Sequence, residues 1–152
     1  MKILFICTGN TCRSPIAEAI FNSRCNLKNV KAESAGVSIV KNTSISNYSS
    51  SLILNNLNCD YSSRVAIQLT TEMMERADLV LTMTKYIKDL LILTFNNMED
   101  KIFSLNEYVG VEGDIIDPYG GNEVIYKNAF DLLDNSIQLL INKIEEDKDI
   151  RE

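Results

Sequence analysis

A short polar loop near the N-terminus carries a cysteine and an arginine at a spacing that suits phosphate chemistry. The loop reads Cys7-Thr8-Gly9-Asn10-Thr11-Cys12-Arg13-Ser14. Backbone N–H groups of a loop curled around one point can bind phosphate oxygens, and an arginine can grip two of them with its planar fork. A thiolate could then attack the phosphorus. We therefore interpret residues 7–14 as a candidate phosphate-binding loop, with Cys7 as nucleophile and Arg13 as anchor.

The chain contains no histidine. This excludes Ser-His-Asp and Cys-His catalysis and any zinc site with histidine ligands. A thiol must therefore be activated by its other surroundings, and the N–H groups that bind an oxyanion also favour the thiolate form of Cys7. Gly9 and Asn10 tolerate the positive φ that a tight loop needs. The Ser14 hydroxyl could donate a further hydrogen bond to the sulfur.

A displacement at phosphorus also needs a proton donor for the leaving group. Asp117 is the candidate, because it lies in a glycine-rich segment and Pro118 restricts it to an extended backbone. We expect its carboxyl to be buried against the phosphate pocket, where it could act first as an acid and then as a base for water. An Asp-Pro pair that only forms a turn is the alternative, and Asp114 is the competing carboxylate.

Predicted strands and helices alternate along the chain and place the loop between the first strand and the first helix. A continuous apolar run predicts a strand at residues 3–7, and alternating apolar and polar residues predict one at 30–35. Two further strands are predicted at residues 78–82 and 101–104. Helical spacing of apolar residues predicts helices at residues 15–27, 44–58, 71–77, 84–93 and 122–148. Pro15 suits the first turn of its helix, and residues 107–121 are predicted to be a loop.

This alternation predicts an α/β fold, a three-layer doubly wound sheet of four parallel strands with helices on both faces. Ligands of such sheets bind outside the carboxyl ends of the strands, near the switch in strand order. Residues 7–14 follow the first strand at that kind of position. Because the chain has 152 residues and no Pro-rich or Gly/Ser-rich linker, we expect a single domain over residues 1–152.

The bulk composition is that of an ordinary soluble globular protein, with 45% apolar and 24% charged residues. The net charge of −6 argues against nucleic acid as a partner. No stretch is long and apolar enough to span a membrane, and the apolar run at residues 3–7 is too short for a signal peptide. The four cysteines form no metal-type pairs and no evident disulfide framework. We therefore expect a cytoplasmic protein without a metal site.

Four segments spread over essentially the whole chain resemble the low-molecular-weight protein tyrosine phosphatase family. They are CTGNTCRSPIAEA at residues 7–19, SAGV at 34–37, ADLVLTMT at 77–84 and DPYGG at 117–121. The resemblance implies the flavodoxin-like fold of that family and a phospho-cysteine intermediate at Cys7. It also implies phosphate binding by Arg13 and the loop amides, and acid–base catalysis by Asp117.

The same resemblance implies supporting roles for other residues. Asn10 would hold the loop in its strained shape together with Ser34. Cys12 would form a reversible disulfide with Cys7 that protects the nucleophile from over-oxidation. Phosphorylated proteins are the expected partners, a monomer is the expected state, and no metal or organic cofactor is expected.

Two details resemble the bacterial protein arginine phosphatases within this family. Thr11 stands where tyrosine-specific members usually carry Ile or Leu, and Tyr-Gly-Gly follows the Asp-Pro pair where they carry an aromatic pair. A small Thr11 leaves room for the planar guanidinium of phosphoarginine, with which Asp117 could pair. Gly120 and Gly121 would remove a wall that stacks on a phenol, while Tyr119 keeps one flat wall. Thr11 as mere loop filler is the alternative interpretation, and tyrosine phosphatase is the alternative function.

Three other functions fit less well. Thioredoxin-coupled arsenate reductases share this fold but need further cysteines in a segment that corresponds to residues 80–95, and this chain has none there. Cys25 and Cys59 lie elsewhere. A phosphoryl carrier must keep its phosphate and would not combine Arg13 with an acid such as Asp117. A non-catalytic phosphate-binding module would show no steady turnover of p-nitrophenyl phosphate.

Overall fold

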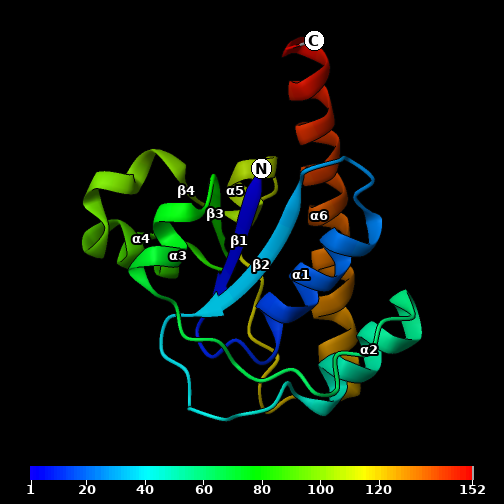
Figure 1. Ribbon diagram of the computed structural model, residues 1–152. Coiled ribbons are helices and arrows are strands. Elements are labelled where there is room, and N and C mark those ends of the chain that lie inside the picture. Colours follow the sequence, from blue (N-terminus) through cyan, green and yellow to red (C-terminus); the bar gives the residue numbers. More distant parts are fainter. Residues whose placement is uncertain (152) are drawn as a thin grey trace.

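Four parallel strands form one sheet in this computed structural model, which describes residues 1–151. The strands are β1 (Lys2–Cys7), β2 (Lys31–Gly36), β3 (Leu79–Thr82) and β4 (Ile102–Ser104). Their order is β2-β1-β3-β4, and each neighbouring pair is parallel (Figure 1). The chain builds outward from β1 first to one side and then to the other, so the switch in strand order lies at β1. The predicted sheet is confirmed.

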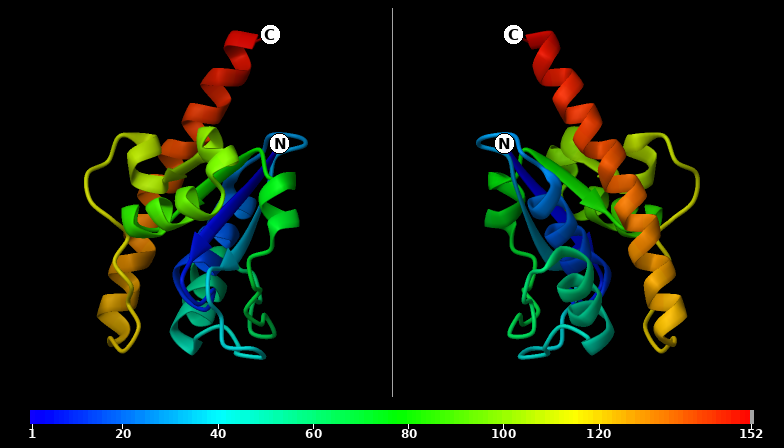
Figure 2. Two further views of the ribbon diagram at one scale, coloured as in Figure 1. Left: turned by 90° about the vertical axis from the view of Figure 1, so that its left-hand side faces the viewer. Right: turned by 90° about the vertical axis from the view of Figure 1, so that its right-hand side faces the viewer.

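Helices cover both faces of the sheet. They are α1 (Arg13–Arg24), α2 (Asn47–Leu57), α3 (Thr71–Arg76), α4 (Lys85–Thr94), α5 (Leu105–Val109) and α6 (Glu123–Arg151), with a 3₁₀ segment η1 (Asn96–Lys101). Helices α1 and α6 lie on one face with α2 beside them, and α3 and α4 lie on the other (Figure 2). The predicted three-layer α/β architecture is therefore confirmed.

Strand β1 forms the centre of two apolar cores. Ile3 and Phe5 point into the larger core, which α1 and α6 complete, whereas Leu4 and Ile6 point into the smaller core under α3 and α4. All four side chains are buried, and each contributes about 1.5–3 kcal/mol by leaving water. Burial on both faces explains why the strand is a continuous apolar run rather than an alternating one. Because the strand is held from both faces, the position of its last residue, Cys7, is fixed, and with it the start of the loop that follows.

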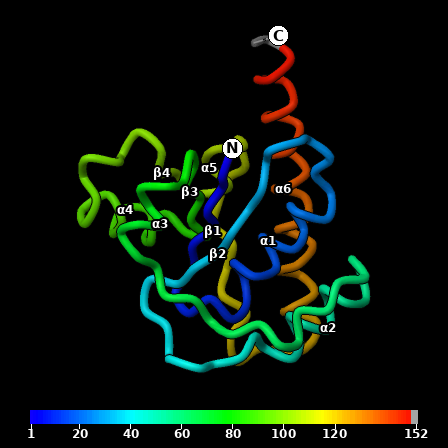
Figure 3. The backbone as a smooth tube through the Cα atoms, in the orientation of Figure 1, coloured from blue at the N-terminus to red at the C-terminus, as the bar shows by residue number. Residues whose placement is uncertain are grey.

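Three connecting segments meet at the carboxyl ends of the strands. The first follows β1, the second follows β2, and the third joins α5 to α6; the tube in Figure 3 shows them at the same end of the molecule. Residues from all three line one pocket. This is the place at which open α/β sheets bind their ligands.

The predicted bounds of two helices are wrong. Helix α1 begins at Arg13 rather than at residue 15 and ends at Arg24 rather than at 27. Helix α2 begins at Asn47 rather than at 44. Ser46 caps α2 by accepting a hydrogen bond from a backbone N–H of its first turn, while residue 44 forms an isolated antiparallel bridge with another loop. Apolar spacing alone cannot locate such caps.

The predicted loop at residues 107–121 is wrong at its start, where the short helix α5 lies. The Ser104 hydroxyl accepts a hydrogen bond from the Glu107 N–H, and the Glu107 carboxylate accepts one from the Ser104 N–H. This reciprocal capping box satisfies two donors that a helix start would otherwise leave unpaired. The helix ends at Gly110, which adopts a positive φ of 79°. The remainder of the predicted loop is irregular.

Helix α6 is the longest element, with 29 residues. The middle of α6 packs against α1 and into the larger core through buried residues such as Phe130, Leu133 and Ile137. Its C-terminal turns project beyond the sheet (Figure 1). Among the described residues, no helix, α6 included, is long and apolar enough to cross a membrane.

Candidate active site

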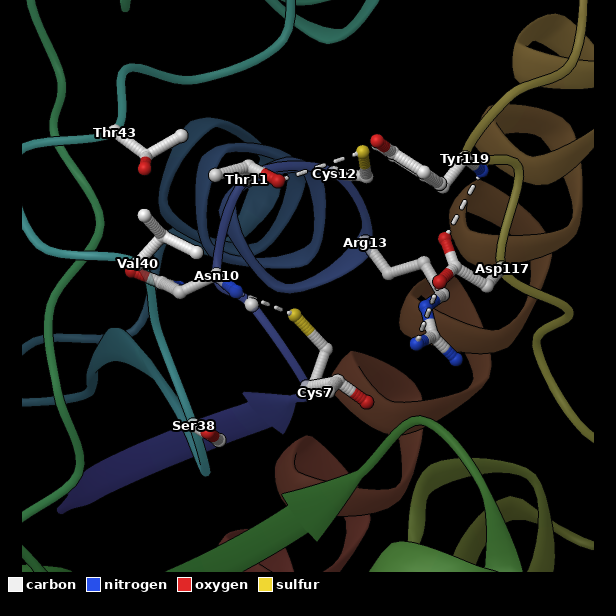
Figure 4. Close-up of a pocket in the computed structure, with 12 residues that line it drawn as sticks. Cys7, Asn10, Thr11, Cys12, Arg13, Ser38, Val40, Thr43, Asp117 and Tyr119 are labelled. Carbon is white, nitrogen blue, oxygen red and sulfur yellow. Dashed lines mark hydrogen bonds and ion pairs between the residues drawn. The ribbon is translucent and has the colours of Figure 1, made fainter.

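Cys7 is the last residue of β1, and its side chain lines the pocket that the following loop encloses (Figure 4). The residue is only 3% exposed. Its sulfur accepts a hydrogen bond from the Asn10 backbone N–H at 3.2 Å and lies 2.8 Å from the Ser14 hydroxyl oxygen. The predicted contact with Ser14 is present. Donors around a sulfur stabilise its thiolate form, so the surroundings suit a nucleophile without histidine.

Asn10 holds the loop in its shape. It adopts a positive φ of 55°, which asparagine tolerates better than most residues. Its side-chain oxygen accepts a hydrogen bond from the Ile67 N–H at 2.9 Å, and its amide nitrogen donates to Ser14 and Ser34 at 2.7 and 3.0 Å. The predicted pairing with Ser34 is therefore present. The predicted positive φ lies at Asn10 and not at Gly9, because one left-handed residue supported by its side chain suffices for the turn.

Helix α1 begins directly at the pocket. Cys12 occupies the N-cap position, and none of the described side chains caps the helix there. The N–H groups of the first turn therefore lack capping partners, and Pro15 has no N–H to satisfy. Cys12 and Arg13 line the pocket, so the positive end of the helix dipole lies at the pocket and makes it suitable for an anion.

Arg13 lies in the first turn of α1 and is almost completely buried, with 4% exposure. One guanidinium nitrogen, Nη1, donates a hydrogen bond to the Ile115 carbonyl at 2.9 Å, and Nη2 lies 3.7 Å from the Asp117 carboxylate. Arg13 therefore lines the pocket with its guanidinium already oriented. A fixed fork of donors is well placed to bind phosphate oxygens.

Asp117 lines the same pocket but is not buried as predicted. Its side chain is 50% exposed, because the segment that carries it crosses the surface between α5 and α6. One carboxylate oxygen accepts a hydrogen bond from the Tyr119 N–H at 3.0 Å, which closes an Asx turn. The turn that the alternative interpretation expected is thus present, and it presents the carboxylate to Arg13.

Asp114, the competing carboxylate, lies outside the pocket. Its oxygen accepts a hydrogen bond from the Lys85 N–H at 3.0 Å. That N–H belongs to the first turn of α4, where a carboxylate also interacts favourably with the helix dipole. Asp114 therefore anchors the loop to α4, and Asp117 is the carboxylate that lines the pocket together with the candidate nucleophile.

The pocket has a volume of about 310 Å³. Residues 7–13, Asp117 and Tyr119 line it, as predicted. Ser14 does not line it but lies buried beneath the sulfur. Ser38, Val40 and Thr43 also line the pocket and were missed. The sequence carried only an indirect signal for these three residues. They follow β2, which lies beside β1, and the loops that follow neighbouring parallel strands lie at the same edge of the sheet.

Gly36 lets the second loop approach the phosphate loop closely. A Cβ atom at this position would lie 2.7 Å from the Thr8 carbonyl oxygen and 3.0 Å from the Asn10 nitrogen. The next two residues donate hydrogen bonds from their N–H groups to the carbonyls of Cys7 and Thr8, each at 3.0 Å. The phosphate loop is thus clamped from outside as well as from within.

In the Tyr119-Gly120-Gly121 segment, the tyrosine lines the pocket as predicted, and the glycines have an additional, local role. Tyr119 is 82% exposed and forms an outer wall of the pocket, whereas neither glycine lines it. Gly120 adopts a positive φ of 78°. A Cβ atom on Gly121 would lie within 2.9 Å of both Ile125 and the Pro118 carbonyl oxygen. The glycines therefore allow the tight turn that leads into α6.

Cys12, the second loop thiol, contacts a tyrosine of α6. Its sulfur lies 3.4 Å from the Tyr126 hydroxyl, and the Tyr126 ring packs against Tyr48 with a centroid separation of 5.0 Å. Burial, assisted by the bond to Cys12, raises the pKa of Tyr126 to about 12. Its hydroxyl therefore stays protonated at neutral pH. Cys7 and Cys12 are both free thiols that line the same pocket.

The remaining cysteines lie away from the pocket. Cys25 and Cys59 are partly buried free thiols that pack against the larger core. Within residues 1–151, no group of three or more His, Cys, Asp or Glu side chains gathers in a way that could hold a metal ion. The segment 80–95 carries no cysteine, so the thiol relay of the arsenate reductases has no counterpart there.

The fold agrees with comparisons to known proteins. The family of low molecular weight phosphotyrosine protein phosphatases matches residues 2–150, and the chain belongs to this family. It is therefore a phosphatase. The predicted resemblance, fold and enzyme class are confirmed.

Individual relatives include both arginine and tyrosine phosphatases. A protein-arginine-phosphatase from Bacillus subtilis is 40% identical over 97% of this chain and 99% of its own. A low molecular weight protein-tyrosine-phosphatase from Staphylococcus aureus, PtpB, is 39% identical over 88% of this chain and 91% of its own. The structure of the YwlE arginine phosphatase from Geobacillus stearothermophilus matches with a TM-score of 0.91 at 34% identity, covering 99% of this chain and 97% of that one.

Proposed function

We propose that this protein removes phosphate from phosphoarginine side chains of proteins through a phospho-cysteine intermediate at Cys7. The observation that carries the proposal is one pocket in which Cys7, Arg13 and Asp117 meet and in which Thr11 forms part of the wall. A 40% identical relative named as an arginine phosphatase supports this choice of substrate.

The first step follows from the positions of these groups. The loop N–H groups and Arg13 bind the phosphate oxygens and neutralise their charge. The Cys7 thiolate attacks phosphorus, the P–N bond to the guanidine breaks, and Asp117 donates its proton to the departing nitrogen. The products of this step are a free arginine side chain and a phosphorylated Cys7.

The second step restores the enzyme. A water molecule attacks the phosphorus, Asp117 accepts a proton from it, and the P–S bond breaks to release inorganic phosphate. Cys7 can depart as a thiolate because the Ser14 hydroxyl and the Asn10 N–H both contact the sulfur and stabilise its negative charge. One carboxylate thus serves as acid and then as base.

Thr11 carries the choice of phosphoarginine over phosphotyrosine. A threonine side chain is small enough to leave space beside the phosphorus for the planar guanidinium, which is wider there than a phenolic oxygen. Asp117 lies in the same pocket and can pair with the cationic group. Tyrosine phosphatase activity is the second candidate, favoured by the exposed Tyr119 ring at the pocket mouth and by the relative named as a tyrosine phosphatase.

Cys12 is proposed as the redox partner of Cys7. Hydrogen peroxide would oxidise the Cys7 thiolate to a sulfenic acid with release of hydroxide, and the Cys12 thiol would then attack that sulfur, expelling water and forming a disulfide. A dithiol reductant would return both residues to thiols by disulfide exchange and would itself be oxidised to a disulfide. Both thiols are free and line one pocket, which supports the pairing.

The domain organisation, oligomeric state, cofactor need and cellular compartment of the enzyme complete the proposal. We infer that residues 1–152 work as one phosphatase domain and as a monomer, on phosphorylated proteins and without a metal or organic cofactor. The acidic net charge of −6 disfavours nucleic acid, and four free cysteines suit the reducing cytoplasm.

Activity on matched phosphoarginine and phosphotyrosine peptides tests the proposal. Both peptides should share one sequence and differ only in the phosphorylated residue, and kcat/KM should be measured for each with the Cys7→Ser variant as the background control. The proposal predicts a higher kcat/KM for the phosphoarginine peptide. A higher value for phosphotyrosine would replace it with the second candidate.

A further inference from the structure

Two neighbouring isoleucines in the segment that carries Asp117 have opposite surroundings. Ile115 is 1% exposed and belongs to the larger core, whereas Ile116 is 75% exposed. Asp117 comes next and lines the pocket. This alternation is that of an extended chain, in which residues two positions apart lie on the same side. The burial of Ile115 therefore helps to determine which way the carboxylate two positions later faces.

The backbone of Ile115 is tied to the strand that ends in the nucleophile. Its N–H donates a hydrogen bond to the Met83 carbonyl at 3.0 Å, and the Met83 N–H donates in turn to the Ile6 carbonyl at 3.0 Å. Ile6 directly precedes Cys7 in β1. Two consecutive backbone hydrogen bonds and a buried side chain thus fix the position of Ile115 relative to Cys7.

The carbonyl of Ile115 holds the phosphate anchor. It accepts a hydrogen bond from the Arg13 Nη1 atom at 2.9 Å, and the Arg13 Nη2 atom lies 3.7 Å from the Asp117 carboxylate, beside it in Figure 4. One segment therefore contacts both terminal nitrogens of the same guanidinium. An arginine has further N–H donors, so these contacts orient the group and leave donors for the phosphate oxygens.

Arg13 depends strongly on this one carbonyl. Among the residues that the structure describes, the Ile115 oxygen is the only hydrogen-bond acceptor of the Arg13 side chain. The guanidinium is almost completely buried, and a buried charge is unfavourable unless it is paired and hydrogen-bonded. A shift of Ile115 would therefore change the orientation of Arg13.

We propose that Ile115 is a positioning residue that couples the phosphate anchor to the acid. Its buried side chain fixes the segment, its carbonyl orients Arg13, and the extended chain returns the Asp117 carboxylate to the same guanidinium. Ile115 does not line the pocket, so it acts only through these two residues. The inference rests on the proposed function, in which Arg13 binds phosphate and Asp117 is the acid.

This role differs from ordinary packing in what it predicts. Truncation of a side chain that only packs lowers stability, and the molecules that remain folded keep their kinetic and binding constants. Truncation of a side chain that positions two groups changes the constants of the folded molecules as well. Two separate quantities should respond: phosphate binding through Arg13, and protonation of the leaving group through Asp117.

The main test compares the two neighbouring isoleucines. In Ile115→Ala, kcat for a phosphoarginine peptide should fall on the order of ten-fold, within the hundred-fold that a displacement of about 1 Å can cost. The dissociation constant of inorganic phosphate should rise several-fold. Ile116→Ala is the same change at an exposed position and should leave both quantities unchanged. Steady-state kinetics and calorimetry measure them, at a temperature where circular dichroism shows the variants to be folded.

Two conservative variants grade the effect. Ile115→Val keeps most of the buried side chain and should recover most of both losses. Ile115→Leu keeps the volume but changes the branched shape, so the segment must shift to repack it. We expect losses in Ile115→Leu that lie between those of Ile115→Val and Ile115→Ala.

A double variant isolates the effect on the acid. In the Asp117→Asn background there is no acid left to position, so Ile115→Ala should lower kcat by a smaller factor than it does in the wild-type background. Its effect on the dissociation constant of phosphate should persist, because that effect passes through Arg13. Equal factors for kcat in both backgrounds would contradict the coupling to Asp117.

The outcomes are distinct. Equal kcat and equal phosphate dissociation constants in folded Ile115→Ala and Ile116→Ala would overturn the inference. If Ile115→Ala does not fold, the pair Ile115→Leu and Ile116→Leu decides in the same way. Failure of the proposed function looks different, because the wild-type protein would then show no turnover that depends on Cys7. The phosphate dissociation constants would still decide whether Ile115 orients Arg13.

Discussion

The two sides of the pocket are built differently. On the nucleophile side, Cys7, Asn10 and Ser14 are buried, and each is held by hydrogen bonds. On the acid side, Asp117 is 50% exposed and Tyr119 is 82% exposed, on a turn between two helices. The comparison indicates that the thiolate cradle is formed before substrate binds, because its shape is over-determined. The acid side can instead adjust to the leaving group.

The largest effect should come from the preformed side. Cys7→Ser replaces the thiolate with a hydroxyl that the same donors cannot activate sufficiently, so turnover should fall to the detection limit. Phosphate binding should persist, because the loop amides and Arg13 remain. Steady-state kinetics and phosphate titration by calorimetry measure the two quantities. Retained turnover would remove Cys7 from its proposed role.

Asp117→Asn tests the exposed side. Loss of the acid should lower kcat on the order of 100-fold, the typical contribution of general acid catalysis. The loss should be smaller for p-nitrophenyl phosphate, whose leaving group needs little protonation, than for phosphoarginine. Comparing kcat for both substrates checks this. A full loss with both substrates alike would point instead to a disturbed Arg13, which lies 3.7 Å from Asp117.

A matched pair of glycine substitutions compares the rigidity of the two sides. Gly36→Ala introduces a Cβ atom 2.7 Å from the Thr8 carbonyl oxygen, so the phosphate loop must move, and kcat should fall by roughly ten-fold. Gly120→Ala meets no atom within 4 Å and carries only the strain of its positive φ of 78°. It should cost about 1 kcal/mol of stability with kcat nearly unchanged. Thermal unfolding and kinetics measure both, and equal losses of kcat would refute the distinction.

Thr11→Ile should change the substrate preference of the enzyme without a general loss of activity. The larger side chain narrows the pocket beside the phosphorus, so the ratio of kcat/KM for phosphoarginine over phosphotyrosine peptides should fall by up to about ten-fold. Thr11→Ser is the matched control, because it keeps the hydroxyl and adds no bulk. An unchanged ratio in Thr11→Ile would leave the substrate choice to other residues.

The local parts of the site could be predicted from the sequence, whereas of its long-range parts only the approach of Asp117 to the loop and the Asn10–Ser34 pairing were predicted. Residues 7–14 form one segment whose chemistry and flanking elements are visible in the sequence, and the structure brings residues 7–13 together around the pocket with Ser14 against the sulfur of Cys7. The exposure of Asp117 depends on how the α5–α6 segment crosses the surface, which no spacing records. Arg64 reaches Glu18 across 46 positions, and only the packed fold reveals this contact. Helix caps such as Ser46 and Ser104 were also decided by local hydrogen bonds rather than by apolar periodicity.

The most direct test of the whole account is to trap the reaction intermediate. Wild-type enzyme should be mixed with a phosphoarginine peptide, quenched within one turnover, digested, and examined by mass spectrometry under conditions that preserve thiophosphates. The account predicts a transient phosphate adduct on the peptide that contains Cys7, formed and lost at rates consistent with kcat. An adduct on a different residue, or turnover without any adduct on Cys7, would contradict it.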